Sequence, residues 1–171
     1  IRDYKGLDLL LDAFRDLGDT YQLVIAGESY GNFDKYEQII QTLPEPSAVK
    51  VFNRYISDAE VPAFFSCADV CVLPYRTATQ SGISAMAYHF EVPVIVTPAG
   101  GLAEAVEGPG TGLVASGTDA NSLNRAIRKF FTMDRDVLVA NIRKEKLALT
   151  WERFAHDLCD FAGHLKQLST N

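Results

Sequence analysis

The chain has 171 residues, which is enough for one α/β domain with a sizeable core. Lysine and arginine number 16 against 22 aspartates and glutamates, and the resulting net charge of -6 argues against a surface for nucleic acid or anionic membranes. With 47% hydrophobic and 22% charged residues, the composition is that of an ordinary globular protein and argues against disorder.

The spacing of apolar residues predicts helices and strands that alternate along most of the chain. Leucine and phenylalanine recur at three- and four-residue steps from Leu7 to Leu17, which predicts a helix, and a buried strand is expected at Tyr21–Gly27. Further strands are expected at 49–52, 68–73, 92–96 and 112–114, and further helices at 33–43, from a capping box at 57–60, at 82–90, 102–106, 119–132, 134–147 and 151–168. This alternation predicts an α/β domain with a parallel sheet and helices on both faces.

The start of the chain differs from that of most domains. Residues Arg2–Gly6 read as a loop that runs directly into the first helix, with no strand before it. We therefore expect the chain to be an excerpt of a longer protein, with at least one strand upstream.

The loops after Gly27, Leu73 and Thr97 are the expected place for chemistry, because open parallel sheets bind ligands at the carboxyl ends of their strands. In the second of these loops, Leu73–Ile83 joins a buried strand to a helix through small and hydroxylated residues, and Thr79–Gly82 could let a phosphate approach the backbone closely. The N–H groups and the positive dipole end of that helix could bind a phosphate. A helix cap by Ser81 explains the same residues equally well.

Two other groups of residues allow two interpretations each. Gly100-Gly101 ahead of Glu104 permits close approach of a ligand, but a tight strand-to-helix turn is the favoured interpretation. Arg2 and Lys5 bracket a short loop, and two such cations suit a diphosphate, although surface charge is the ordinary role of such a pair.

Other kinds of site find little support. The three histidines lack metal-ligand spacing, and the three cysteines, odd in number and set in apolar patterns, argue against a disulfide scaffold or a zinc site. No P-loop or dinucleotide fingerprint is present. Without a signal peptide pattern or an apolar run near the roughly 20 residues of a membrane span, we expect a cytoplasmic protein.

Five short motifs, in this order and spacing, resemble the carboxyl-terminal domain of group 1 glycosyltransferases. They are Lys5–Leu10, Leu23–Gly27, Ala68–Pro74, Pro93–Val96 and Gly100–Glu104. The resemblance covers nearly the whole chain and ends at Thr150–Glu152. It implies a Rossmann-like domain that forms the carboxyl-terminal half of a retaining enzyme of the GT-B architecture.

The resemblance implies that this domain binds a nucleoside diphosphate sugar. Arg2 and Lys5 would hold the donor diphosphate and act in catalysis, with no metal or other cofactor. The donor-binding residues that it implies are Gly27, Glu28, Tyr55, Ile56, Thr79, Gln80, Ser81, Gly82 and Glu104. An amino-terminal domain outside this chain would bind the acceptor, which could be a saccharide, a lipid-linked molecule or a small molecule, and could bring the enzyme to a membrane surface.

The sequence departs from the family pattern at several positions. Many members carry two glutamates eight residues apart, and the matching positions here are Ala78 and Met86; Thr77 stands where a related subgroup has glutamate. Glu91 stands where a left-handed glycine is expected. Thr77, Ala78 and Met86 keep open a non-catalytic module that binds a nucleotide or a sugar phosphate. A further alternative is an enzyme of the same fold, such as a nucleotide-sugar epimerase or phosphorylase.

Overall fold

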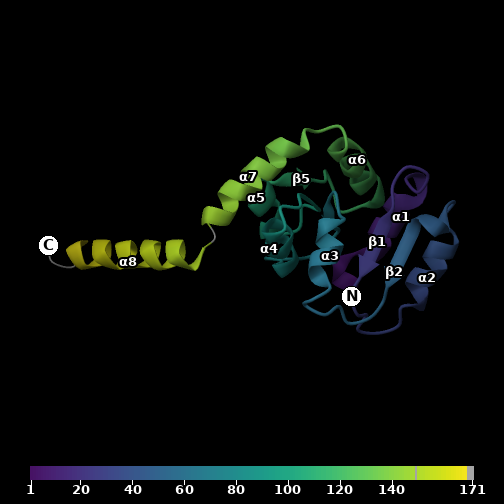
Figure 1. The fold of residues 1–171 in the computed structure, drawn as a ribbon, viewed down its shortest axis with the longest axis horizontal. Coiled ribbons are helices and arrows are strands. Elements are labelled where there is room, and N and C mark those ends of the chain that lie inside the picture. The colour runs from purple at the N-terminus through teal and green to yellow at the C-terminus, as the bar shows by residue number, and fades with distance from the viewer. Residues whose placement is uncertain (149, 169–171) are drawn as a thin grey trace.

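The computed structural model describes residues 1–148 and 150–168 (Figure 1). In the described residues, five parallel strands form two sheets. The strands are β1 (Leu23–Ala26), β2 (Val49–Phe52), β3 (Cys71–Leu73), β4 (Val94–Val96) and β5 (Gly112–Val114). The helices are α1 (Leu7–Ala13), α2 (Asp34–Gln41), α3 (Val61–Ser66), α4 (Gly82–His89), α5 (Gly101–Glu107), α6 (Ala120–Phe130), α7 (Arg135–Ala148) and α8 (Trp151–Leu168). Short 3-10 helices occupy Asp3–Lys5, Phe14–Asp16 and Pro46–Ala48.

The predicted α/β class with parallel strands is confirmed, but the strands divide into two sheets. β1 pairs with β2, and β4 lies between β3 and β5 with Val94 beside both Cys71 and Gly112. No strand in the described residues joins β1 to β3. Three of the strands are shorter than expected, because the outer residues of the apolar runs have no partners in the sheet ladders.

The core covers both faces of the three-stranded sheet. In β4, Ile95 packs into one cluster and its two valine neighbours pack into the other, and all three side chains are fully buried. This burial on both faces explains why the strand reads as a continuous apolar run. The face of β1 and β2 that carries Val24 and Phe52 is less covered than the faces of the three-stranded sheet, and these two residues are 40% and 39% exposed.

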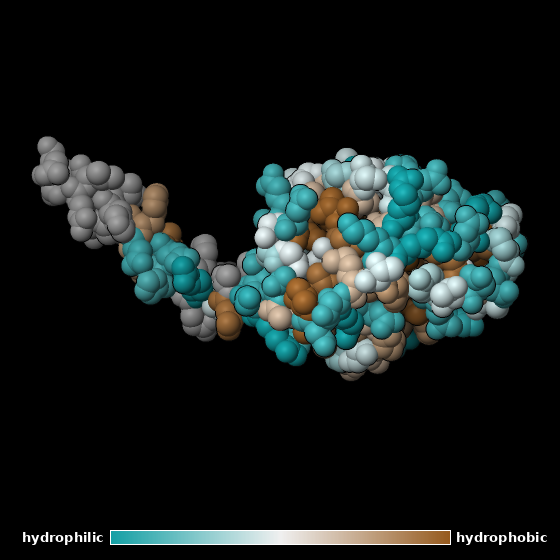
Figure 2. All heavy atoms as spheres, turned by 90° about the horizontal axis from the view of Figure 1, so that it is seen from above, coloured by the Kyte–Doolittle hydropathy of each residue, from teal (hydrophilic) through white to brown (hydrophobic). Residues whose placement is uncertain are grey.

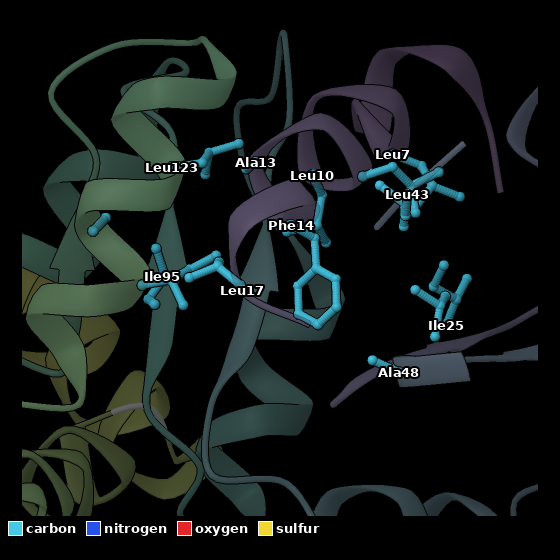
Figure 3. Packing of buried hydrophobic residues seen from close by; sticks show 14 of the residues in the cluster. Leu7, Leu10, Ala13, Phe14, Leu17, Ile25, Leu43, Ala48, Ile95 and Leu123 are labelled. Carbon is cyan, nitrogen blue, oxygen red and sulfur yellow. The ribbon is translucent and has the colours of Figure 1, made fainter. Parts of the chain in front are cut away.

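Helix α1 connects the two sheets through the first of these clusters. Leu17, just beyond α1, lies near Ile95 of β4, while Leu7 at the start of the helix lies near Leu43 and on the side of Ile25 in β1 (Figure 3). Three- and four-residue spacing of the apolar side chains places them on this one face of the helix. The loop that precedes α1 is thereby fixed relative to both sheets.

The surface outside the core is mostly polar. The face of the domain seen in Figure 2 is largely hydrophilic, with separate hydrophobic patches between the charged residues. Helix α8 extends away from the other elements (Figure 1), and its Leu158 and Phe161 are exposed. In the part of the chain that the structure describes, no helix has the length and the apolar character needed to cross a bilayer.

Glu91, between α4 and β4, has a left-handed backbone with φ 59°, as its position in the sequence indicates. It is the one non-glycine residue with a positive φ in the described chain. Its carboxylate accepts hydrogen bonds from Arg143 Nε and Nη2 at 3.0 and 2.8 Å, and Lys146 Nζ lies 3.7 Å away. The Arg143 hydrogen bonds lower the pKa of Glu91 from its ordinary value. Glu91 therefore ties α7 to the turn before β4.

We expect a Glu91→Gly variant to be more stable than a Glu91→Ala variant by about 1 kcal/mol. Both changes remove the contacts with α7, but only glycine removes the cost of a left-handed backbone. Urea unfolding of the two variants measures the difference. Equal stabilities would show that the backbone at residue 91 carries no strain.

Candidate functional site

The loop before α1 is fixed against the end of β3. The backbone N–H of Arg76 donates to Tyr4 O at 2.7 Å, and the Arg76 side chain forms an ion pair with Asp8. Gly6 has a left-handed backbone, with φ 64°, and a Cβ there would lie 2.0 Å from Pro74 O. Glycine is therefore required for the two backbones to approach this closely.

This arrangement brings Lys5 to the loop after β3. Lys5 Nζ lies 5.4 Å from the centre of the Tyr75 ring. A pocket of about 490 Å³ opens here, and its lining residues are Tyr4, Lys5, Tyr75, Ala78, Thr79, Gln80, Ser81, Gly82, Ile83 and Met86. The structure thus places Lys5 in one pocket with four of the predicted donor-binding residues, Thr79–Gly82. The positions of the two missing family glutamates, Ala78 and Met86, line the same pocket.

The N-terminus of α4 faces this pocket, and Ser81 caps it. Ser81 Oγ accepts the backbone N–H of Ile83 at 3.2 Å, and Ser84 Oγ donates to Ser81 O at 2.6 Å. The N–H of Gly82 has no acceptor among the described residues, and beyond its chain neighbours and the backbone of α4 no heavy atom lies within 4 Å of where a Gly82 Cβ would be. The cap and the open N–H are therefore compatible, because Ser81 satisfies one backbone donor of the first turn and leaves another free.

Gly100 and Gly101 lie directly against the backbone of this loop, at Ala78 and Thr79. A Cβ on Gly100 would lie 2.1 Å from Ala78 O, and one on Gly101 would lie 2.8 Å from Thr79 O. The chain's own backbone therefore occupies the space that these glycines leave, as a tight turn requires. Glu104 is exposed in the first turn of α5 and is not among the residues that line the pocket.

Arg2 is close to Lys5 in the chain but lies outside the pocket lining. Its backbone O accepts the N–H of Lys5 at 3.0 Å, while its guanidinium carbon lies 5.0 Å from the centre of the Tyr30 ring. Gly27 and Glu28, after β1, are also outside the lining. Gly27 has φ 133° and donates its N–H to Phe52 O at 3.1 Å, with open space around its Cβ position.

Tyr55 and Ile56 lie in the loop after β2, which an ion pair holds in place. Arg54 binds the Glu60 carboxylate and donates to Tyr55 O at 3.0 Å. Glu60 also accepts from the backbone N–H and the hydroxyl of Ser57, at 3.1 and 2.7 Å. The hydrogen bonds from Arg54 and Ser57 lower the pKa of Glu60 to about 2, so this carboxylate stays charged at neutral pH.

The Ser57–Glu60 contact forms only half of the predicted capping box. The Ser57 hydroxyl donates to Glu60 and so does not cap the helix, and α3 begins at Val61. Tyr55 is exposed and Ile56 is half-buried, and neither is among the residues that line the Lys5 pocket.

The sequence patterns did not single out Tyr4 as a pocket residue, and they included Tyr75 in the loop after Leu73 without giving it a role. Tyr75 follows β3 directly, at the strand end where ligands are expected, and this position was the available signal. Lys5 is the charged residue in the lining, which contains no aspartate, glutamate or histidine. A cation in the same pocket as a helix N-terminus is suited to bind an anion.

Residues 1–146 match the model of the family described as "Glycosyl transferases group 1". Because this match covers most of the chain, the protein belongs to that family. In the described part of the chain, no group of three or more potential metal ligands is found.

The chain is also similar to individual glycosyltransferases in sequence and in structure. The chain is 31% identical over 134 residues to a GDP-mannose-dependent phosphatidylinositol monomannoside mannosyltransferase of Mycolicibacterium smegmatis, covering 72% of this chain and 34% of the relative. The structure is similar to sucrose-phosphate synthase of Thermosynechococcus elongatus, with a TM-score of 0.78, 25% identity, and coverage of 98% and 44% of the two chains. It also shares the fold of Anabaena HepE in complex with UDP, with a TM-score of 0.74, 19% identity, and coverage of 93% and 46%. The chain spans 34% to 42% of the length of the curated relatives that it matches.

Proposed function

We propose that this chain is the donor-binding domain of a retaining glycosyltransferase that uses a nucleoside diphosphate sugar. The observation that carries the proposal is that Lys5 and the open N-terminus of α4 line one pocket. A positive side chain and a helix N-terminus both favour negative charge, and together they suit the diphosphate of such a donor. A GDP-mannose-dependent relative and a UDP complex of the same fold support this choice of ligand.

The proposed chemistry rests on stabilising the leaving group. The bond between the anomeric carbon and the phosphate oxygen breaks, and the electron pair stays on that oxygen. The acceptor hydroxyl forms the new bond to the same carbon, and its proton passes to the leaving diphosphate. Lys5 and the N–H of Gly82 would stabilise the negative charge that develops on the diphosphate.

Five of the remaining predicted residues surround this centre in the proposal, and Glu104, exposed and outside the pocket lining, has no role in it. Arg2, on the same 3-10 turn as Lys5, would bind the diphosphate after turning from Tyr30. Tyr55 and Ile56 would lie beside the base, and Gly27 and Glu28 along the floor of the cleft. We also propose that no metal takes part, and that a further, amino-terminal domain of the whole protein binds the acceptor.

A second candidate is a non-catalytic module that binds the same nucleotide. Ala78 and Met86 favour it, because both line the pocket at positions where many family members have glutamate. Such a module would bind a nucleoside diphosphate but would neither transfer nor hydrolyse the sugar.

The test is a transfer assay on the full-length protein with Lys5→Met. Removing one group that stabilises the leaving diphosphate is expected to lower kcat/KM by about 100-fold. Lys144→Met serves as the matched control, because Lys144 is exposed on α7 and does not line the pocket. An Arg2→Met, Lys5→Met double variant with unchanged transfer would refute the site. Donor binding by the wild type without transfer or hydrolysis would favour the module.

A further inference from the structure

Tyr75 lines the pocket, and its backbone is held by contacts with two strands. Its side chain is buried, at 5% exposure, directly after Pro74 at the end of β3. Its backbone O accepts the hydroxyl of Thr97, which is itself fully buried at the end of β4. The N–H of Thr97 donates to Leu73 O at 3.3 Å, so the backbone near Tyr75 is tied to both strands.

The ring of Tyr75 contacts the side chains of Lys5 and Tyr4. Lys5 Nζ lies 5.4 Å from the ring centre, within the range of a cation–π interaction. Tyr4 packs against the same ring edge-on, with centroids 6.0 Å apart and an interplanar angle of 73°. Lysine has a long, flexible side chain, so a fixed aromatic partner reduces the number of positions that its ammonium group can take.

The hydroxyl of Tyr75 contacts the other side of the pocket. Its oxygen lies 3.3 Å from Oγ of Ser81, the residue that caps α4. One buried side chain therefore touches both groups to which the proposed function assigns the diphosphate: the cation through its ring and the helix N-terminus through its hydroxyl.

We propose that Tyr75 is a positioning residue that sets the distance between the Lys5 ammonium and the N-terminus of α4. This inference rests on the proposed donor site. Tyr75 acts through Lys5 and Ser81, so it contributes to diphosphate binding without being a catalytic residue. Its effect is therefore specific for ligands that engage Lys5.

The test compares calorimetric binding of UDP, GDP and ADP, and of the matching monophosphates, to the full-length protein and its variants. Tyr75→Phe keeps the ring and loses the hydroxyl, and we expect it to weaken diphosphate binding by no more than about threefold, the effect of one neutral hydrogen bond. Tyr75→Leu loses both contacts, and we expect a loss of about tenfold for the diphosphate, from the cation–π contact and the hydrogen bond. Monophosphate binding should change less, because Tyr75 acts on the diphosphate through Lys5. A general packing defect would instead weaken the binding of both ligands equally.

The double variant Lys5→Met, Tyr75→Leu distinguishes positioning from an independent contribution. If Tyr75 acts largely through Lys5, this double variant binds the diphosphate only a few-fold more weakly than Lys5→Met alone, and the residual loss comes from the contact with Ser81. Losses that multiply, or Tyr75→Leu binding as tightly as the wild type, would overturn the positioning role while leaving the donor site intact. A wild type that binds no diphosphate would overturn both proposals. Circular dichroism checks the fold, and Tyr75→Met, which fills the space without a ring, replaces Tyr75→Leu if the latter does not fold.

Discussion

An Ile95→Ala variant is expected to lose about 2–5 kcal/mol of its free energy of unfolding. Ile95 is fully buried at the centre of β4, the strand with neighbours on both sides. Its side chain packs in the cluster that includes Leu17 and Leu123 (Figure 3), so removing it leaves a cavity that a well-packed interior refills only in part. Urea unfolding followed by circular dichroism measures this loss.

Val137→Ala is the control for the core prediction. Val137 is 55% exposed on α7, and surface substitutions of this kind change stability by less than about 0.5 kcal/mol. Equal unfolding midpoints for Ile95→Ala and Val137→Ala would contradict the placement of Ile95 in a well-packed core.

A Gly100→Ala variant is expected to lose stability and nucleotide binding together. Gly100 has φ 52° and ψ −141°, and a Cβ there would lie 2.1 Å from Ala78 O. Holding a non-glycine residue in this sparsely populated region of φ and ψ costs about 1–3 kcal/mol. Overpacking adds about 1–3 kcal/mol. Because the loop at Ala78 and Thr79 must move to relieve the contact, the pocket changes shape, and nucleoside diphosphate affinity should fall by at least tenfold.

Gly31→Ala separates strain from steric contact. Gly31 also has a positive φ, of 130°, but no heavy atom lies within 4 Å of its Cβ position. We therefore expect it to show the strain cost without the loss of nucleotide affinity. Thermal unfolding and calorimetry on both variants test this, and a Gly100→Ala protein with wild-type affinity would contradict the role of Gly100 beneath the loop.

Local patterns in the sequence predicted the order of helices and strands well. Val49–Phe52 is a strand with the expected bounds, and Glu91 has the left-handed backbone that its place after α4 indicated. Both depend on neighbours in the chain, through the alternation of apolar residues and the end of a helix. The division into two sheets was not predictable in this way, because strand pairing depends on contacts far apart in the sequence.

The candidate site was predictable in its parts but not in its assembly. The N-terminus of α4 and Lys5 each had a local signal, whereas the contact between Lys5 and Tyr75 joins residues 70 positions apart. The sequence at Gly100 was compatible with either a bound ligand or a tight turn. Only the structure shows that the backbone of Ala78 occupies the space beside this glycine. The direction of the Arg2 side chain toward Tyr30 likewise depends on a loop that follows a different strand.

The most direct test of the donor site is a calorimetric titration of the full-length protein with UDP, GDP and ADP at low salt, each against its monophosphate. We expect one base to be preferred and its diphosphate to bind more tightly than its monophosphate, because the second phosphate meets Lys5 and the N-terminus of α4. Equal affinities for the diphosphate and the monophosphate, or no binding of any of these nucleotides, would contradict the proposed donor site.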